Sequence, residues 1–271
     1  MQSQLALNRR WRLVFSGIFT MTAQASAGVG GLLLAAVIAR IGGPQQLGMF
    51  TVMLSLLGTL GMLARRGQGS LLTRSVAWAA HAEGASSTLA LLVLAVRRVL
   101  LLSILLGAVG SGLLWSGLFG TPFPGSVITL PAALVFVTVL ALFGGYARGI
   151  GRPWLAPLFE MGGISLIAGA IMASLLTFWS EPPAGAVIAV LLIAMLVLMV
   201  IAASVAWRDL PVAERQARAL IPTDAHHHEL RHGQYAFTII AVASFLVQTG
   251  SFLLAAPFLS EADLGLLRAA E

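Results

Sequence analysis

The stretch IARIGGPQQLGMF, residues 38–50, separates two long apolar runs. Two glycines and a proline follow one another at 42–44. This combination is typical of a tight turn, because glycine accepts positive φ and proline cannot continue a helix. We therefore expect two helices, at about 13–40 and 46–64, joined by a hairpin turn.

A similar stretch, APFLSEADLGLL at 256–267, also follows a long apolar run. Both stretches contain a Leu-Gly pair, and Gly48 and Gly265 are 265 − 48 = 217 residues apart. This spacing predicts one repeat followed by the start of a second.

The composition is that of a membrane protein. The 271 residues are 58% hydrophobic and 10% charged, with a mean hydropathy of +0.93, whereas soluble domains carry about 25% charged residues. The chain has no cysteine, which excludes disulfides and thiolate chemistry. All sixteen basic residues are arginine. We attribute the net charge of +6 to membrane topology and predict no nucleic-acid partner.

The N-terminus allows two interpretations. Residues 1–12 are basic, and Ala23, Ala25 and Ala27 would suit a signal-peptidase site, so a cleaved signal peptide is one alternative. The apolar run continues to Ala39, however, far beyond the ~7–15 residues of a signal-peptide core. The length favours a retained membrane helix.

Seven segments contain the ~20 largely apolar residues that a membrane helix needs. Their approximate ranges are 13–40, 46–64, 88–118, 127–147, 154–178, 184–207 and 235–258. The polar stretch 65–87 is expected to separate the second from the third. The predicted fold is an all-α integral membrane protein.

Arginine placement orients these helices. Fourteen of the sixteen lie on one side: Arg9, Arg10, Arg12, Arg65, Arg66, Arg74, Arg97, Arg98, Arg148, Arg152, Arg208, Arg215, Arg218 and Arg231. Only Arg40 and Arg268 lie on the other. Basic residues are retained in the cytoplasm, so we expect a cytoplasmic N-terminus.

Six helices return the chain to its starting side, so a repeat that begins after them has the same orientation as the first. We predict a six-helix bundle at 1–207, a cytoplasmic linker at 208–234 and the first helix of a second, truncated bundle at 235–271.

The first predicted helix carries two regular patterns. Polar residues recur at Ser16, Thr20 and Gln24, and a comparable line in helix 235–258 includes Gln248. Such side chains avoid lipid, which leaves interhelical hydrogen bonding and cavity lining as interpretations. Small residues allow close helix approach and recur at every fourth position: Ala23, Ala27, Gly31, Ala35 and Ala39.

Glu160 is a carboxylate about two turns into the predicted helix 154–178. Intramembrane carboxylates need a partner. Arg148 and Arg152 are nearest in sequence, and Arg152 lies eight residues back on a comparable helical face. Glu160 is either one half of a structural ion pair or a gating or coupling carboxylate.

Two arginine groups, Arg65/Arg66/Arg74 and Arg97/Arg98, agree with the positive-inside rule. They would also suit anionic lipid headgroups or a pyrophosphate, because the guanidinium binds such groups in bidentate fashion.

The sequence shows no catalytic constellation. It lacks the nucleotide loop G-x-x-x-x-G-K-[ST] and the nucleophile elbow G-x-S-x-G. The histidines at 226–228 and 232 lie in a polar linker without a second ligand cluster, so no metal site is expected. We predict neither enzymatic activity nor a cofactor.

Three stretches together resemble the polysaccharide-biosynthesis flippases, the Wzx-like O-antigen and exopolysaccharide transporters of the MOP superfamily. LAAVIARIGGPQQLGMFTVM (34–53) is similar to that family's first helical hairpin, and GQGSLLTR (67–74) to the Gly-rich end of its second helix. YARGIGRPWLAPLFEMG (146–162) is similar to its loop between helices four and five. The positions on the pattern there are Arg148, Gly151, Arg152 and Glu160. The resemblance covers about residues 10–267.

The resemblance implies a bacterial inner-membrane flippase for an undecaprenyl-pyrophosphate-linked oligosaccharide, with two six-helix bundles around a cationic cavity. Its partners would be lipid-linked oligosaccharide, membrane lipids, a polysaccharide polymerase and glycosyltransferases. Arginines would bind the pyrophosphate, and the polar strips would face the sugar. Glu160 would be a gating or coupling residue. The binding residues would be Arg65, Arg66, Arg74, Arg148, Arg152, Ser16, Thr20, Gln24 and Gln248.

The chain departs from that family in holding one bundle and one helix. It would be a fragment, a half-chain that assembles, or an inactive product, and we favour the fragment. Two other functions stay open. A MATE-type drug/cation antiporter would need intramembrane acidic residues, and the first predicted helix has none. The other function is that of a membrane scaffold or a polysaccharide polymerase. A polymerase of this kind would need a long extracytoplasmic loop.

Overall fold

A computed structural model describes residues 2–82, 85–179 and 182–208, together with short pieces at 238–240, 243, 256–260 and 262–264. All regular structure in these residues is helical, as the sequence predicts. The elements are α1 (Gln2–Arg65), α2 (Gln68–Ala82), α3 (Ala85–Trp115), α4 (Ser126–Gly149), the 3₁₀ turns η1 (Pro153–Leu155) and η2 (Pro157–Phe159), α5 (Met161–Phe178) and α6 (Ala184–Arg208).

Five helical stretches of the described residues are long and apolar enough to cross a membrane: Gly17–Arg65, Thr88–Trp115, Ser126–Gly149, Met161–Phe178 and Gly185–Arg208. This agrees with the coarse prediction of an α-helical membrane protein. Residues 209–234 of the predicted linker and most of the predicted helix 235–258, including Gln248, lie outside the described residues, and Arg208 is the last residue of α6.

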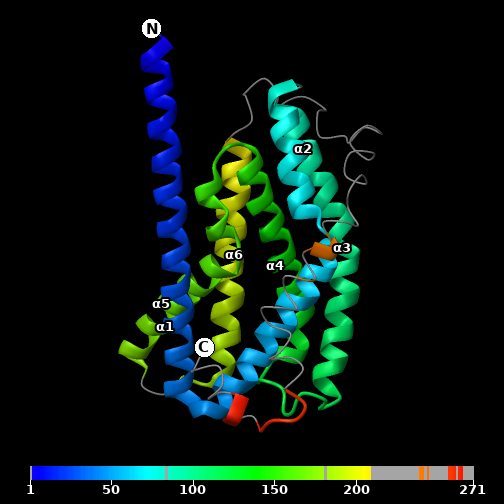
Figure 1. The fold of residues 1–271 in the computed structure, drawn as a ribbon. Helices are drawn as coiled ribbons and strands as arrows, with labels where there is room; N and C mark the ends of the chain where they lie inside the picture. Colours follow the sequence, from blue (N-terminus) through cyan, green and yellow to red (C-terminus); the bar gives the residue numbers. More distant parts are fainter. Residues whose placement is uncertain are drawn as a thin grey trace.

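The first stretch contains the predicted turn. The backbone leaves helical geometry at Gly43 (φ 70°, ψ −171°), directly before Pro44. The chain reverses direction there, so that α1 consists of two arms (Figure 1). The arms hold 43 − 17 = 26 and 65 − 43 = 22 residues of this stretch, and each suffices for a bilayer crossing. The predicted helical hairpin is therefore confirmed as two arms around Gly43.

The stretch 65–87 separates two candidate membrane spans, Gly17–Arg65 and Thr88–Trp115, as predicted, but most of it forms the helix α2, which the sequence did not predict. The apolar side chains of α2 are spaced to cover one face, and they are buried against α3 and α4. A second hydrophobic cluster results, formed by Leu71, Leu72, Val76, Ala79, Leu89, Leu91, Leu92, Leu94, Ala95, Val99, Leu142, Tyr146 and Ala206. Tertiary burial thus stabilises a helix that a hydropathy window overlooks.

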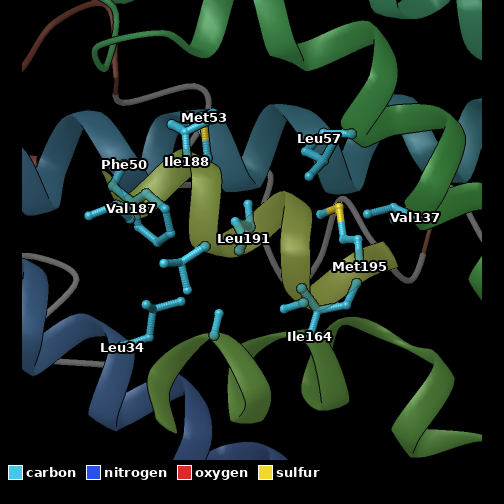
Figure 2. Packing of buried hydrophobic residues seen from close by; sticks show 14 of the residues in the cluster. Leu34, Phe50, Met53, Leu57, Val137, Ile164, Val187, Ile188, Leu191 and Met195 are labelled. Atoms are coloured by element: carbon cyan, nitrogen blue, oxygen red, sulfur yellow. The ribbon is translucent and has the colours of Figure 1, made fainter. Parts of the chain in front are cut away.

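The larger cluster surrounds α6. Figure 2 shows Val187, Ile188, Leu191 and Met195 of α6 facing side chains of α1, α4 and α5. Leu191 is 2% exposed and Met195 is fully buried. α6 is apolar along its whole length, as expected for a helix with neighbours on several sides.

The first arm of α1 contacts α5 through small residues, which include Ala27 of the predicted ladder but Gly30 in place of its next member, Gly31. A Cβ added at Gly30 would lie 2.3 Å from Leu166 Cα, and one at Gly162 would lie 2.2 Å from Ala27 Cβ. A Cβ at Gly31 would meet nothing within 4 Å. The contact therefore follows Ala27 and Gly30, because the position of α5 selects one of two neighbouring small-residue rows.

The described C-terminal pieces include one helical turn at the position that corresponds to the start of the second arm of α1. Ser260 corresponds to Gly43 at the 217-residue offset. It precedes a helical turn in which Leu264 N–H donates to Ser260 O over 3.0 Å. Leu264 and its counterpart Leu47 are both buried in the larger cluster, at 1% and 6% exposure. Both turns lie at the same end of the bundle (Figure 1). The two corresponding leucines are thus both buried, whereas the residues before them differ, being helical at 39–42 and turn or bend at 256–259.

Candidate functional site

The site begins where α4 ends. Gly151 has φ 79°; its N–H donates to Arg148 O (3.1 Å), and Arg152 N–H donates to Ala147 O (2.8 Å). This is a Schellman motif, in which a left-handed glycine satisfies the last carbonyls of a helix. The motif places Arg148 on the last turn of α4 and directs the chain back across the bundle.

The connection from α4 to α5 is built by two prolines. Pro153 and Pro157 each start a 3₁₀ turn, which is a favoured place for a residue that lacks an N–H. Glu160 then takes an extended conformation (φ −102°, ψ −176°) as the N-cap of α5. The prediction that Glu160 lies two turns inside a helix 154–178 is wrong, because Pro157 interrupts that helix and α5 starts at Met161.

The Glu160 side chain forms an ion pair with Arg148. Oε1 of Glu160 accepts a hydrogen bond from Nη2 of Arg148, and the two side chains are 37% and 41% exposed. The sequence indicated Arg152 as the better placed partner on helical spacing. That expectation fails because the intervening residues are 3₁₀ turns, in which an eight-residue separation does not return to the same face.

A second arginine belongs to this cluster. Arg65, the last residue of α1, interacts electrostatically with both Glu160 and Arg148. Its Nε donates to Gly61 O over 3.1 Å, which holds the guanidinium along its own helix. Glu160 therefore pairs with Arg148, and the guanidinium of Arg65 lies near this pair without a hydrogen bond to it. Glu160 is the only acidic residue in 2–82 and 85–179, so these helices supply no other counter-ion.

Glycines bring α2, which follows Arg65 directly, into backbone contact with α4. A Cβ at Gly145 would lie 2.6 Å from Gly69 O, so α2 and α4 cross at backbone contact. Thr73 Oγ1 donates to Gly145 O across this crossing (3.0 Å). The adjacent Gly144 leaves room for the carboxylate, since a Cβ there would lie 3.4 Å from Glu160 Oε1.

The polar strip of α1 lies at a similar height. α1 and α5 run parallel, with Ala27 next to Gly162, and the rings of Phe19 and Trp154 are 6.4 Å apart. At 1.5 Å per residue, Thr20 and Gln24 therefore lie near the level of Glu160. Thr20 is half-buried and Gln24 is exposed. The side chain of Ser16 and all of Gln248 lie outside the described structure.

The other predicted arginines surround this group without forming part of its ion pair. Arg66 is exposed and has a positive φ of 46° at the joint between α1 and α2. Arg74 and Arg152 are exposed as well. Arg148 and Arg208 lie at the end of the bundle at which α4 and α6 finish, Arg65 and Arg66 lie at the joint of α1 and α2, and Arg97 and Arg98 lie near the middle of α3. That this end faces the cytoplasm stays a prediction.

Two features of the site were missed in the sequence. The Gly145-x-x-x-Gly149 spacing is a small-residue helix-contact motif and could have predicted the α2–α4 crossing. Gln68, at the start of α2, is 2% exposed, and its Oε1 has no hydrogen-bond partner; no sequence pattern indicates this burial. The described residues contain no group of three or more His, Cys, Asp or Glu that could hold a metal ion.

Comparison of the chain with protein-family models, curated proteins and solved structures finds no match. Functional inference therefore rests on the residues of this chain alone.

Proposed function

We propose that this chain belongs to a flippase that moves a polyprenyl-pyrophosphate-linked oligosaccharide across the bacterial cytoplasmic membrane. One observation carries the proposal: the Arg148–Glu160 ion pair lies at the end of α4 with a second guanidinium group, that of Arg65, nearby. The cluster has a formal charge of +2 − 1 = +1 and is partly open to solvent. An excess of guanidinium in such a place favours a polyanionic ligand.

The chemistry of the cluster suits a pyrophosphate. Guanidinium groups form paired, charge-assisted hydrogen bonds with phosphate oxygens, which an ammonium group cannot match in geometry. Thr20 and Gln24, near the same height, have the donors and acceptors that sugar hydroxyls require. A lipid-linked oligosaccharide contains a pyrophosphate next to sugar hydroxyls. The polyprenyl chain attached to them is apolar and suits the lipid-facing helices.

The path across the membrane is proposed to be alternating access between two parallel bundles, of which 1–207 forms the first. The common environment of Leu47 and Leu264 supports a second unit in the same orientation, beginning after the linker 208–234. The described helices would then form one wall of the transport route.

A binding experiment tests the proposal. The purified chain is reconstituted in nanodiscs and titrated with a fluorescent polyprenyl-pyrophosphate oligosaccharide, with the same oligosaccharide on a neutral polyprenol as comparison. We expect saturable binding of the pyrophosphate form only, weakened about tenfold or more by Arg148→Ala, since hydrogen bonds between charged groups contribute about 1.5–3 kcal/mol. Arg208→Ala, which removes an exposed arginine at the end of α6, is the matched control. Equal binding of the neutral lipid, or equal losses in both variants, would contradict the proposal.

A MATE-type antiporter is the second candidate, because Glu160 is a lone carboxylate at a helix start within the bundle. In that case a cation would compete with Arg148 for Glu160. Drug efflux from cells that express the chain, abolished by Glu160→Gln and without any effect on surface polysaccharide, would favour this function over the flippase.

A further inference from the structure

We infer that the Glu160 carboxylate is a displaceable counter-ion, which occupies the guanidinium group of Arg148, near that of Arg65, until the anionic headgroup of a lipid takes its place. The identity of that headgroup as a pyrophosphate rests on the proposed function. The exchange itself rests on the contacts of these three residues.

The first argument is the charge count. One carboxylate cannot neutralise two guanidinium groups, so an incoming phosphate gains from both arginines, whereas Glu160 leaves one unmatched. Ion pairs that are partly exposed are weak, on the order of 0.2–1 kcal/mol. With side chains 41% and 37% exposed, the Arg148–Glu160 pair is weak enough to be exchanged.

The second argument is that Glu160 has another stable place for its charge. It is the N-cap of α5, yet its side chain makes no capping hydrogen bond, because it is turned toward Arg148. The N-terminus of a helix stabilises a nearby negative charge by about 0.3–1 kcal/mol. A carboxylate released from Arg148 therefore remains beside a favourable dipole and within reach of water.

The third argument is the fixed backbone around the pair. Gly144 of α4 has no side chain that separates it from the carboxylate, since a Cβ there would be in contact with Oε1 at 3.4 Å. The Schellman turn after Arg148 and the 3₁₀ turns before Glu160 fix the two backbones. The exchange then needs side-chain rotation alone, without movement of either helix.

The test measures lipid binding by three forms of the full chain in nanodiscs: wild type, Glu160→Gln and the charge reversal Arg148→Glu/Glu160→Arg. The probes are a polyprenyl pyrophosphate, a phosphatidylglycerol and a neutral polyprenol. Removal of the counter-ion in Glu160→Gln should tighten pyrophosphate binding about two- to fivefold, the ratio that corresponds to the strength of an exposed ion pair. The charge reversal keeps an ion pair but moves the cation to the helix N-terminus, and it should weaken binding. Thermal unfolding of each variant reports folding separately.

The outcomes distinguish this inference from the proposed function. Unchanged or weaker pyrophosphate binding in a folded Glu160→Gln protein overturns the exchange and leaves the flippase proposal standing. Full binding by the charge-reversed protein also overturns it, because the pair would then be structural only. If phosphatidylglycerol binds in place of the pyrophosphate and Glu160→Gln still tightens it, the exchange is supported and the proposed substrate is wrong.

Discussion

The crossing of α2 and α4 provides the sharpest test of this structure, through the substitution Gly145→Ala. The new Cβ would lie 2.6 Å from Gly69 O and 3.3 Å from Gly69 Cα. Both atoms belong to backbone, so the overlap can be relieved only if the two helices separate. Separation would also stretch the hydrogen bond from Thr73 Oγ1 to Gly145 O, now 3.0 Å long.

The expected cost follows from these two effects. Overpacking of a tight contact costs about 1–3 kcal/mol, and an interhelical hydrogen bond in a membrane contributes on the order of 0.6 kcal/mol. Alanine favours a helix over glycine by about 1 kcal/mol, which offsets part of this cost. We therefore expect Gly145→Ala to destabilise the protein by about 1–3 kcal/mol. For a chain of this size, about 2–4 °C per kcal/mol would lower the unfolding midpoint by roughly 2–12 °C.

Gly69→Ala is the matched control, since it adds the same methyl group to the partner helix. A Cβ at Gly69 would meet nothing within 4 Å, and alanine favours a helix over glycine by about 1 kcal/mol. The midpoint of this variant should stay unchanged or rise. Thermal unfolding of the detergent-purified proteins, followed by circular dichroism, compares the two. Equal midpoints for both variants would show that α2 and α4 do not cross at this point.

Three further predictions address other contacts of the bundle. Gly30→Ala should destabilise the protein by about 1–3 kcal/mol, because its Cβ would meet the backbone of α5. Gly31→Ala should leave the unfolding midpoint unchanged. A larger loss of stability in Gly31→Ala than in Gly30→Ala would favour the ladder that the sequence indicates. Thr138→Val removes the buried 2.9 Å hydrogen bond between Thr138 of α4 and Ser103 of α3 and should cost about 0.6 kcal/mol in the same assay. An unchanged unfolding midpoint would show that this bond contributes nothing to stability. Because the chain has no cysteine, Ser116→Cys and Arg208→Cys can be labelled singly. An impermeant thiol reagent should modify the first in intact cells and the second only after permeabilisation, and the opposite pattern would invert the topology.

Part of the fold could be predicted because it depends on local chemistry. The turn at Gly43 follows from two glycines and a proline within an apolar sequence, and these residues permit few other conformations. The membrane character follows from composition. Pro157 is also a local signal, because proline disrupts a helix interior. It indicates that the helix expected at 154–178 begins no earlier than residue 157, and in the structure α5 begins at Met161.

The helix α2 could not be predicted by the same reasoning. Its residues are too polar for a membrane span, and its stability comes from buried partners such as Leu91 and Leu142, far away in sequence. The register of the α1–α5 contact is a similar case. Two rows of small residues lie side by side on α1, and only the position of α5 selects Gly30 over Gly31.

The sequence by itself determined that this protein is an α-helical membrane protein with a reversal near Gly43 and an excess of arginine between its helices. These properties are set by side-chain hydropathy, backbone freedom and charge, which act over a few residues. Only the tertiary structure decided that Glu160 caps α5, that it pairs with Arg148 and not Arg152, and that Arg65 is near. These relations depend on the Schellman turn, the 3₁₀ turns and the glycine crossing of α2 and α4, which together bring distant segments to one place.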